Sequence, residues 1–65
     1  MDLSDVRERV LEINASSNDD EQANSLEGKL YVDVLRTIAA GAPDAAGLAV
    51  AALESQKLGF HRWAA

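Results

Sequence analysis

Carboxylates are the only reactive side chains that recur in a regular pattern in this 65-residue sequence. Three of them are spaced by three and four residues, so on a helix they form a row with about 5–6 Å between neighbours. A second cluster, Asp-Asp-Glu, follows at residues 19–21. Nucleic-acid phosphates are also several ångström apart, so such a surface would attract a protein that grips nucleic acid through Lys and Arg. The candidate partner-binding residues are Asp5, Glu8, Glu12, Asp19, Asp20 and Glu21.

The sequence offers little for catalysis or metal binding. His61 is the single histidine. Nothing near it in sequence resembles an orienting carboxylate or the strained elbow that holds a nucleophile. The 19–21 cluster lacks the alternating spacing of a calcium loop, and helix capping explains it. Gly28-Lys29 does not make a phosphate-binding loop, and no cysteine is present to bind zinc. We therefore predict that the protein is not an enzyme, has no catalytic residue, and binds no metal or cofactor.

Length and charge narrow the class of protein further. A chain of 65 residues makes one domain, here residues 1–65. The net charge of −5 argues against direct binding to nucleic acid. Residues 1–35 carry nine acids and three bases, a balance of −6, whereas residues 36–65 carry +1. The acidic N-terminus is not typical of a secretory signal, and no apolar run is long enough for a membrane span, so we expect a cytoplasmic protein without a membrane partner.

The first segment reads as a helix over about residues 2–14. Leu3, Val6, Val10 and Ile13 recur at helical spacing and form one apolar stripe. Asp2 or Ser4 is the expected N-cap. The acidic row falls on the side of the helix opposite the stripe.

A second helix is predicted over about residues 19–40. Asn18 or Asp19 is the expected N-cap, with a later start at Ser25 as the alternative because Gly28 weakens an early turn. Gly41 is suited to end this helix, and a proline two residues later prevents its continuation. Its expected apolar face is Ala23, Leu26, Leu30, Tyr31, Val34, Leu35 and Ile38. The expected ion pairs on the polar face are Lys29 with Asp33, and Asp33 with Arg36.

A third helix is predicted over about residues 45–57, capped by Asp44 and ended by Gly59. Phe60 is expected to fold back onto its last turn. Trp63 covers an open end of the core or anchors a partner. The expected buried face is Ala45, Leu48, Ala49, Ala52 and Leu53. The fold class that follows is all-α, a small three-helix bundle.

The run Lys29-Leu30-Tyr31-Val32-Asp33-Val34-Leu35-Arg36-Thr37-Ile38-Ala39-Ala40-Gly41, with Leu48-Ala49, Ala52-Leu53 and His61-Arg62-Trp63, resembles small proteins of phages and mobile elements. Together with the size and acidity, it is similar to the anti-CRISPR proteins, in particular short type I-C inhibitors. The resemblance covers about residues 26–63 and contains no catalytic motif. It implies a protein of the host bacterial cytoplasm that blocks a CRISPR surveillance complex, as several DNA mimics of that class do. No family site residue is carried over, because the six acids come from the charge pattern alone.

The sequence thus predicts a stoichiometric inhibitor that occupies the basic DNA-binding surface of a type I CRISPR surveillance complex. The protein itself would be a monomer or a small homo-oligomer. One alternative is an antitoxin-like interaction or assembly module, in which the stripe Leu3, Val6, Val10 and Ile13 packs on another chain. Another is a module that sequesters a nucleotide between protomers through its few bases and aromatics. Chains below about 70–80 residues have small cores, which favours dependence on another surface.

Overall fold

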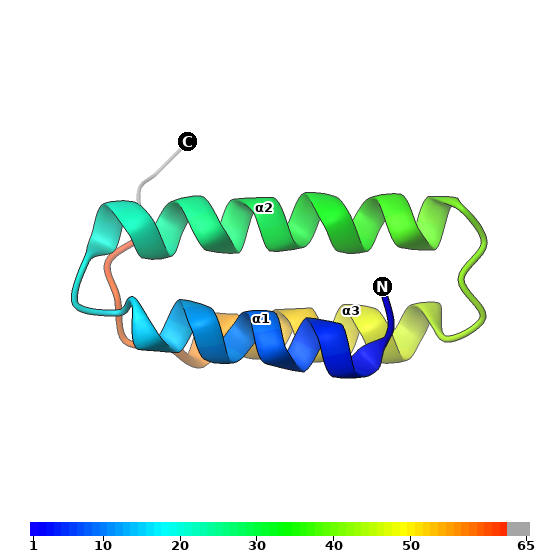
Figure 1. The fold of residues 1–65 in the computed structure, drawn as a ribbon, viewed down its shortest axis with the longest axis horizontal. Coiled ribbons are helices and arrows are strands. Elements are labelled where there is room, and N and C mark those ends of the chain that lie inside the picture. Colours follow the sequence, from blue (N-terminus) through cyan, green and yellow to red (C-terminus); the bar gives the residue numbers. More distant parts are fainter. Residues whose placement is uncertain (63–65) are drawn as a thin grey trace.

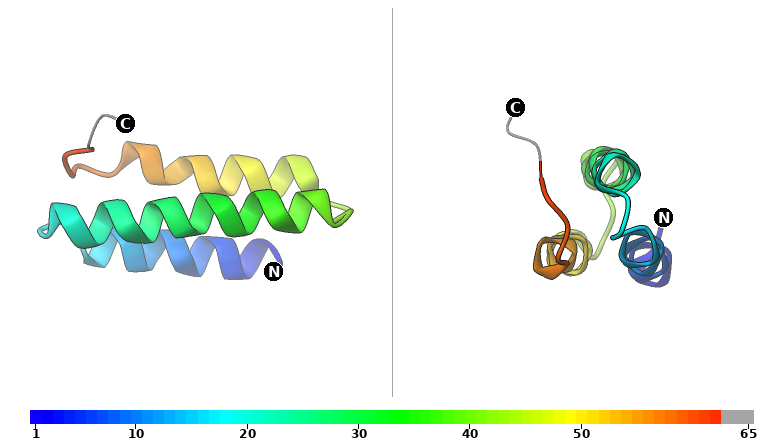
Figure 2. Two further views of the ribbon diagram at one scale, coloured as in Figure 1. Left: turned by 90° about the horizontal axis from the view of Figure 1, so that it is seen from above. Right: turned by 90° about the vertical axis from the view of Figure 1, so that its left-hand side faces the viewer.

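The chain folds into three α-helices followed by one short 3-10 helix (Figure 1). The computed structural model describes residues 1–62, and no strand occurs among them. The elements are α1 (Leu3–Ala15), α2 (Asp20–Ala39), α3 (Ala45–Leu53) and η1 (Glu54–Lys57). α1 and α3 run in the same direction and α2 runs opposite to both, with the three helices at the corners of a triangle (Figure 2). The predicted all-α three-helix bundle is confirmed.

Local side-chain caps determine where the first two helices begin. The Asp2 carboxylate accepts the backbone N–H of Asp5, and the Asp5 carboxylate accepts the N–H of Asp2, both at 2.9 Å. This reciprocal capping box satisfies two backbone donors that the first turn leaves without partners. Asp19 caps α2 by accepting the N–H of Gln22 at 3.2 Å. The second helix therefore begins at residue 20, and the alternative start at Ser25 is wrong.

The turn between α2 and α3 depends on a glycine. Gly41 has a φ of +94°, in the left-handed region that side chains with a Cβ disfavour, and its N–H donates to the carbonyl of Ile38. Asp44 then caps α3 by accepting the N–H of Gly47 at 3.3 Å. The third predicted helix is α-helical only to Leu53, and its last turn, to residue 57, tightens into η1.

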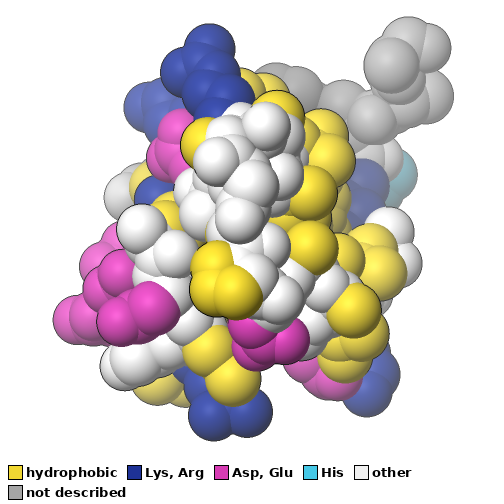
Figure 3. Space-filling model, turned by 90° about the vertical axis from the view of Figure 1, so that its right-hand side faces the viewer, with side chains coloured by type: hydrophobic (Ala, Val, Ile, Leu, Met, Phe, Trp, Pro, Cys, Tyr) yellow, Lys and Arg dark blue, Asp and Glu magenta, His cyan; other side chains and the backbone are white. Residues whose placement is uncertain are grey.

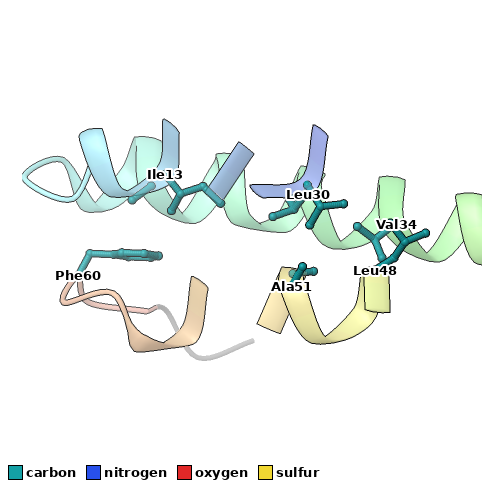
Figure 4. Packing of buried hydrophobic residues seen from close by; sticks show 9 residues of the cluster. Ile13, Leu30, Val34, Leu48, Ala51 and Phe60 are labelled. Atoms are coloured by element: carbon teal, nitrogen blue, oxygen red, sulfur yellow. The ribbon is translucent and has the colours of Figure 1, made fainter. Parts of the chain in front are cut away.

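The core lies along the common axis of the bundle and includes residues from all three helices (Figure 4). Phe60 is only 6% exposed and lies toward Ile13 of α1, so it closes one end of the core. Phe60 thus folds back into the bundle, whereas its predicted contact with the last turn of the third helix stays a prediction. The buried hydrophobic residues are Val6, Ile13, Ala23, Leu30, Val34, Leu48, Ala51, Ala52 and Phe60.

Two leucines that the sequence assigned to the core lie on the surface. Leu35 is 65% exposed and Leu53 is 52% exposed, whereas Ala51 and the acid Glu27 are buried. α3 packs against both α1 and α2 through its buried residues Leu48, Ala51 and Ala52, and Leu53 lies outside this strip. The sequence could not show this, because α3 is apolar on every side.

Two further expectations about α1 and α2 need correction. The α1 stripe proposed for a partner chain is used inside the protein, since Val6 is 0% and Ile13 is 1% exposed. Asp33 does not pair along its own helix but with Arg9 of α1, at 3.1 Å. The expected role of Trp63 lies outside the described residues.

Candidate functional site

The acidic side chains singled out in the sequence lie in two exposed clusters, one along α1 and one at the start of α2, which we together call the acidic edge. Asp5, Glu8 and Glu12 follow the outer side of α1 toward its C-terminal end, and all three are exposed. The loop after α1 leads directly into the first turn of α2, so residues 19–21 lie at the same end of the bundle (Figure 1). The acidic edge comprises Asp5, Glu8, Glu12, Asp19, Asp20 and Glu21, all of which are exposed.

Half of the acidic edge also has a structural task. The Asp5 carboxylate accepts the backbone N–H of Asp2 in the capping box of α1, and Asp19 caps α2. The Asp20 carboxylate accepts the backbone N–H of His61 at 3.1 Å. These bonds hold three of the carboxylates in place. The other three, Glu8, Glu12 and Glu21, form no hydrogen bond or ion pair with any residue among 1–62 and are free to contact a partner.

The ion pairs of the protein leave the acidic edge unneutralised. Three ion pairs form within residues 1–62, and each uses an acid at position 27 or later. They are Arg9 with Asp33 at 3.1 Å, Lys57 with Glu54 at 2.8 Å, and Arg62 with Glu27 at 3.0 Å. Arg9 lies beside the acidic row, yet its guanidinium points to α2. None of the seven acids in residues 2–21 is paired within the described part of the chain, so folding concentrates the negative charge there.

A second group of polar residues is buried between α2, η1 and the segment that follows η1. The Glu27 carboxylate is 7% exposed and accepts Ser55 Oγ at 2.7 Å and Arg62 Nε and Nη2 at 3.1 and 3.0 Å. Ser55 Oγ also lies 2.6 Å from the Tyr31 hydroxyl. The Arg62 guanidinium stacks 4.1 Å from the ring centre of Phe60. We call this group the buried polar cluster: Glu27, Tyr31, Ser55 and Arg62.

The buried polar cluster is structural. Ser55 is 0% exposed, so no substrate reaches its hydroxyl. Burial, followed by the nearby negative charge of Glu27, raises the pKa of Tyr31 above its usual value, so this phenol stays protonated. No buried side-chain nitrogen or oxygen in residues 1–62 lacks a hydrogen-bond partner. The cluster fastens the segment after η1 to α2. Sequence reasoning missed it, and its only local signal was an acid four residues before Tyr31 on the apolar side of a helix.

Hydrophobic side chains gather on the opposite side of the molecule, around α3. Four large ones are exposed: Leu11 (67%), Leu35 (65%), Val50 (61%) and Leu53 (52%). A groove of about 820 Å³ runs between α1 and α3, and a smaller one runs between α2 and α3. In the end-on view of Figure 3, the largest acidic cluster lies on the α1 side and hydrophobic side chains follow the α3 side. The apolar face, as we call this surface, comprises Leu11, Leu35, Ala46, Ala49, Val50 and Leu53.

The described residues provide no metal centre, since no three His, Cys, Asp or Glu side chains among residues 1–62 are placed to share an ion. Within the same range, no helix combines the length and apolarity that crossing a membrane requires.

Comparisons with protein-family models, with curated proteins and with solved structures gave no match to this chain. The acidic edge and the apolar face are the two candidate functional surfaces.

Proposed function

We propose that this protein is a non-catalytic inhibitor that occupies the basic nucleic-acid-binding surface of a host protein complex through its acidic edge. The observation that supports this proposal most directly is the absence of any ion pair at the seven acids of residues 2–21, within the described part of the chain. A row of unpaired, exposed carboxylates presents the charge pattern that Lys and Arg side chains of a nucleic-acid-binding groove are built to contact.

The partner that we propose is a type I CRISPR surveillance complex before it binds target DNA. The resemblance of residues 26–63 to short anti-CRISPR inhibitors supports this choice. The inhibitor acts in stoichiometric amounts and does not itself bind nucleic acid, because its acidic edge repels phosphates. Charge complementarity would speed its association with the complex, and this advantage falls as salt screens the charges.

The helix caps make the acidic edge suitable for this role. The Asp5 and Asp19 carboxylates are held by the backbone N–H groups of Asp2 and Gln22, and Asp20 is held by the N–H of His61. A partner therefore meets several carboxylates whose positions are already set, so less side-chain freedom is lost on binding. Glu8 and Glu12 keep full freedom to adjust to the basic side chains of the partner.

The test is a pull-down with tagged protein from cells that carry a type I CRISPR system, at low and at high salt. We expect capture of the surveillance complex at low salt, loss of capture at high salt, and loss of target-DNA binding by the captured complex. Replacing Glu8 and Glu12 together with Gln should weaken capture. The control is Asp44→Asn, which removes one exposed acid outside the acidic edge and keeps the cap of α3.

Two results would contradict the proposal. If Glu8→Lys combined with Glu12→Lys left inhibition unchanged, the acidic edge would not be the binding surface. If no surveillance complex were captured at any salt concentration, the proposed partner would be wrong.

A further inference from the structure

We propose that the apolar face is the interface of a homodimer in which two copies of this chain pack through α3. Within residues 1–62, α3 is the one helix without a charged residue, over Ala45–Leu53. A helix that is apolar on all sides is normally covered on all sides. In a single copy only one side of α3 is covered, and Val50 and Leu53 are 61% and 52% exposed on the other.

The shape of the apolar face suits a second copy of itself. α3 forms a ridge with an apolar groove on each side, one shared with α1 and one shared with α2. A two-fold axis places the same patch of both copies in contact, so such a patch must contain a ridge and a groove that complement each other. In an antiparallel arrangement, the Val50 ridge of each copy enters the α1–α3 groove of the other. The small residues Ala46 and Gly47 at that groove allow the two helices to approach closely.

Charge also selects this face for self-association. Two copies that each carry a charge of −5 repel one another, and the acidic edge lies on the side of α1 that faces away from the apolar face. Contact through the apolar face keeps the two acidic edges apart. The α1–α3 groove is bordered by Arg7 at its middle and Glu54 at one end. Arg7 has no ion pair among residues 1–62, and an antiparallel second copy brings its own Glu54, which pairs with Lys57 inside that copy, toward this arginine.

A stable dimer needs a large share of the surface of so small a chain. A standard interface buries about 800 Å² on each partner. This is close to a fifth of the 4269 Å² surface of the chain. The apolar face crosses all three helices along the length of α3, and the exposed side chains Leu11 and Leu35 mark its two borders. A dimer built on it would carry two acidic edges pointing outward, so it goes beyond the proposed inhibitor function without depending on it.

The experiment is sedimentation equilibrium of the 65-residue chain from about 1 µM to about 1 mM, at low and at high salt. We expect a species of twice the 6.9 kDa chain mass, with an association that salt does not weaken. Val50→Lys should raise the dissociation constant at least about thirtyfold, as for a central interface residue. The matched control is Val32→Lys, at a 46% exposed position of α2 outside the apolar face, which should leave the dimer intact.

Leu11→Lys is a second variant on the α1 border of the face and guards against a folding effect of Val50→Lys, with far-UV circular dichroism as the check on both. A chain that stays monomeric at the highest concentration would overturn the proposal, and the apolar face would then belong to a different partner. A dimer that survives Val50→Lys and Leu11→Lys would overturn it too. Because salt weakens binding at the acidic edge and not at the apolar face, failure of this proposal is distinguishable from failure of the inhibitor function.

Discussion

Replacing Glu27 with alanine should remove the centre of the buried polar cluster. The Glu27 carboxylate is 7% exposed and accepts three hydrogen bonds, one from Ser55 and two from Arg62. Alanine would leave the fully buried Ser55 hydroxyl with Tyr31 as its remaining side-chain partner. It would also deprive the Arg62 guanidinium of its counter-charge.

The expected loss of stability follows from these contacts. Removing one partner of a buried ion pair costs about 3–5 kcal/mol. The Arg62 side chain is 32% exposed and keeps backbone carbonyl acceptors, so water and these carbonyls offset part of the cost. We therefore expect a loss of about 2–3 kcal/mol in the free energy of unfolding. At about 4–8 °C for each kcal/mol in a domain of this size, the Tm should fall by about 10–20 °C.

The assay is urea unfolding followed by far-UV circular dichroism, at one protein concentration for all variants so that self-association does not differ. Glu8→Ala is the matched control, because this exposed carboxylate has no partner among residues 1–62, and its effect should stay within about 0.5 kcal/mol. Arg62→Ala and the double variant complete a cycle that isolates the coupling between the two side chains. A loss of less than about 0.5 kcal/mol for Glu27→Ala would refute the role assigned to the cluster.

Three more predictions use the same unfolding assay. Because burial raises the pKa of Tyr31, its contribution to stability should be complete below the ordinary pKa of about 10 and should be lost as the pH rises through the raised value. Urea series from about pH 9 to about pH 11 should therefore show a steeper loss for the parent than for Tyr31→Phe, and parallel curves would contradict the assignment. Gly28→Ala should stabilise α2 by up to about 1 kcal/mol, since nothing lies within 4 Å of the added Cβ. Gly41→Ala should destabilise by about 1–2 kcal/mol because its φ is +94°, and effects of the same sign at both glycines would disprove this account.

The acidic edge and the apolar face are expected to respond differently to salt. Binding through the acidic edge should weaken with salt, whereas self-association through the apolar face should not. Variants at Glu8 and Glu12 should therefore change partner capture without changing the dimer. Variants at Val50 should change the dimer first, and should affect capture only if the partner needs two acidic edges at once.

The sequence by itself determined the three helices and most of their ends, although the last turn of the third predicted helix forms η1 instead. Asp2, Asp19 and Asp44 cap the backbone three residues further along, and Gly41 ends α2 through its own backbone conformation. These interactions lie within one helical turn, so residue type and spacing are enough to predict them. The exposure of the acidic row was predictable for the same reason, because helical spacing puts it opposite the buried Val6.

Only the tertiary structure decided how the helices face one another. Hydrophobic periodicity could not predict which side of α3 is buried, since all its sides are apolar. The position of Leu53 outside the core was therefore not predictable from the sequence. The tertiary structure also decided that Arg9 pairs with Asp33, and that Glu27 pairs with Arg62, thirty-five residues away in the sequence. Contacts between distant residues depend on the rotation and crossing of packed helices, which no local spacing encodes. The concentration of unpaired charge at the acidic edge follows from those same distant pairs.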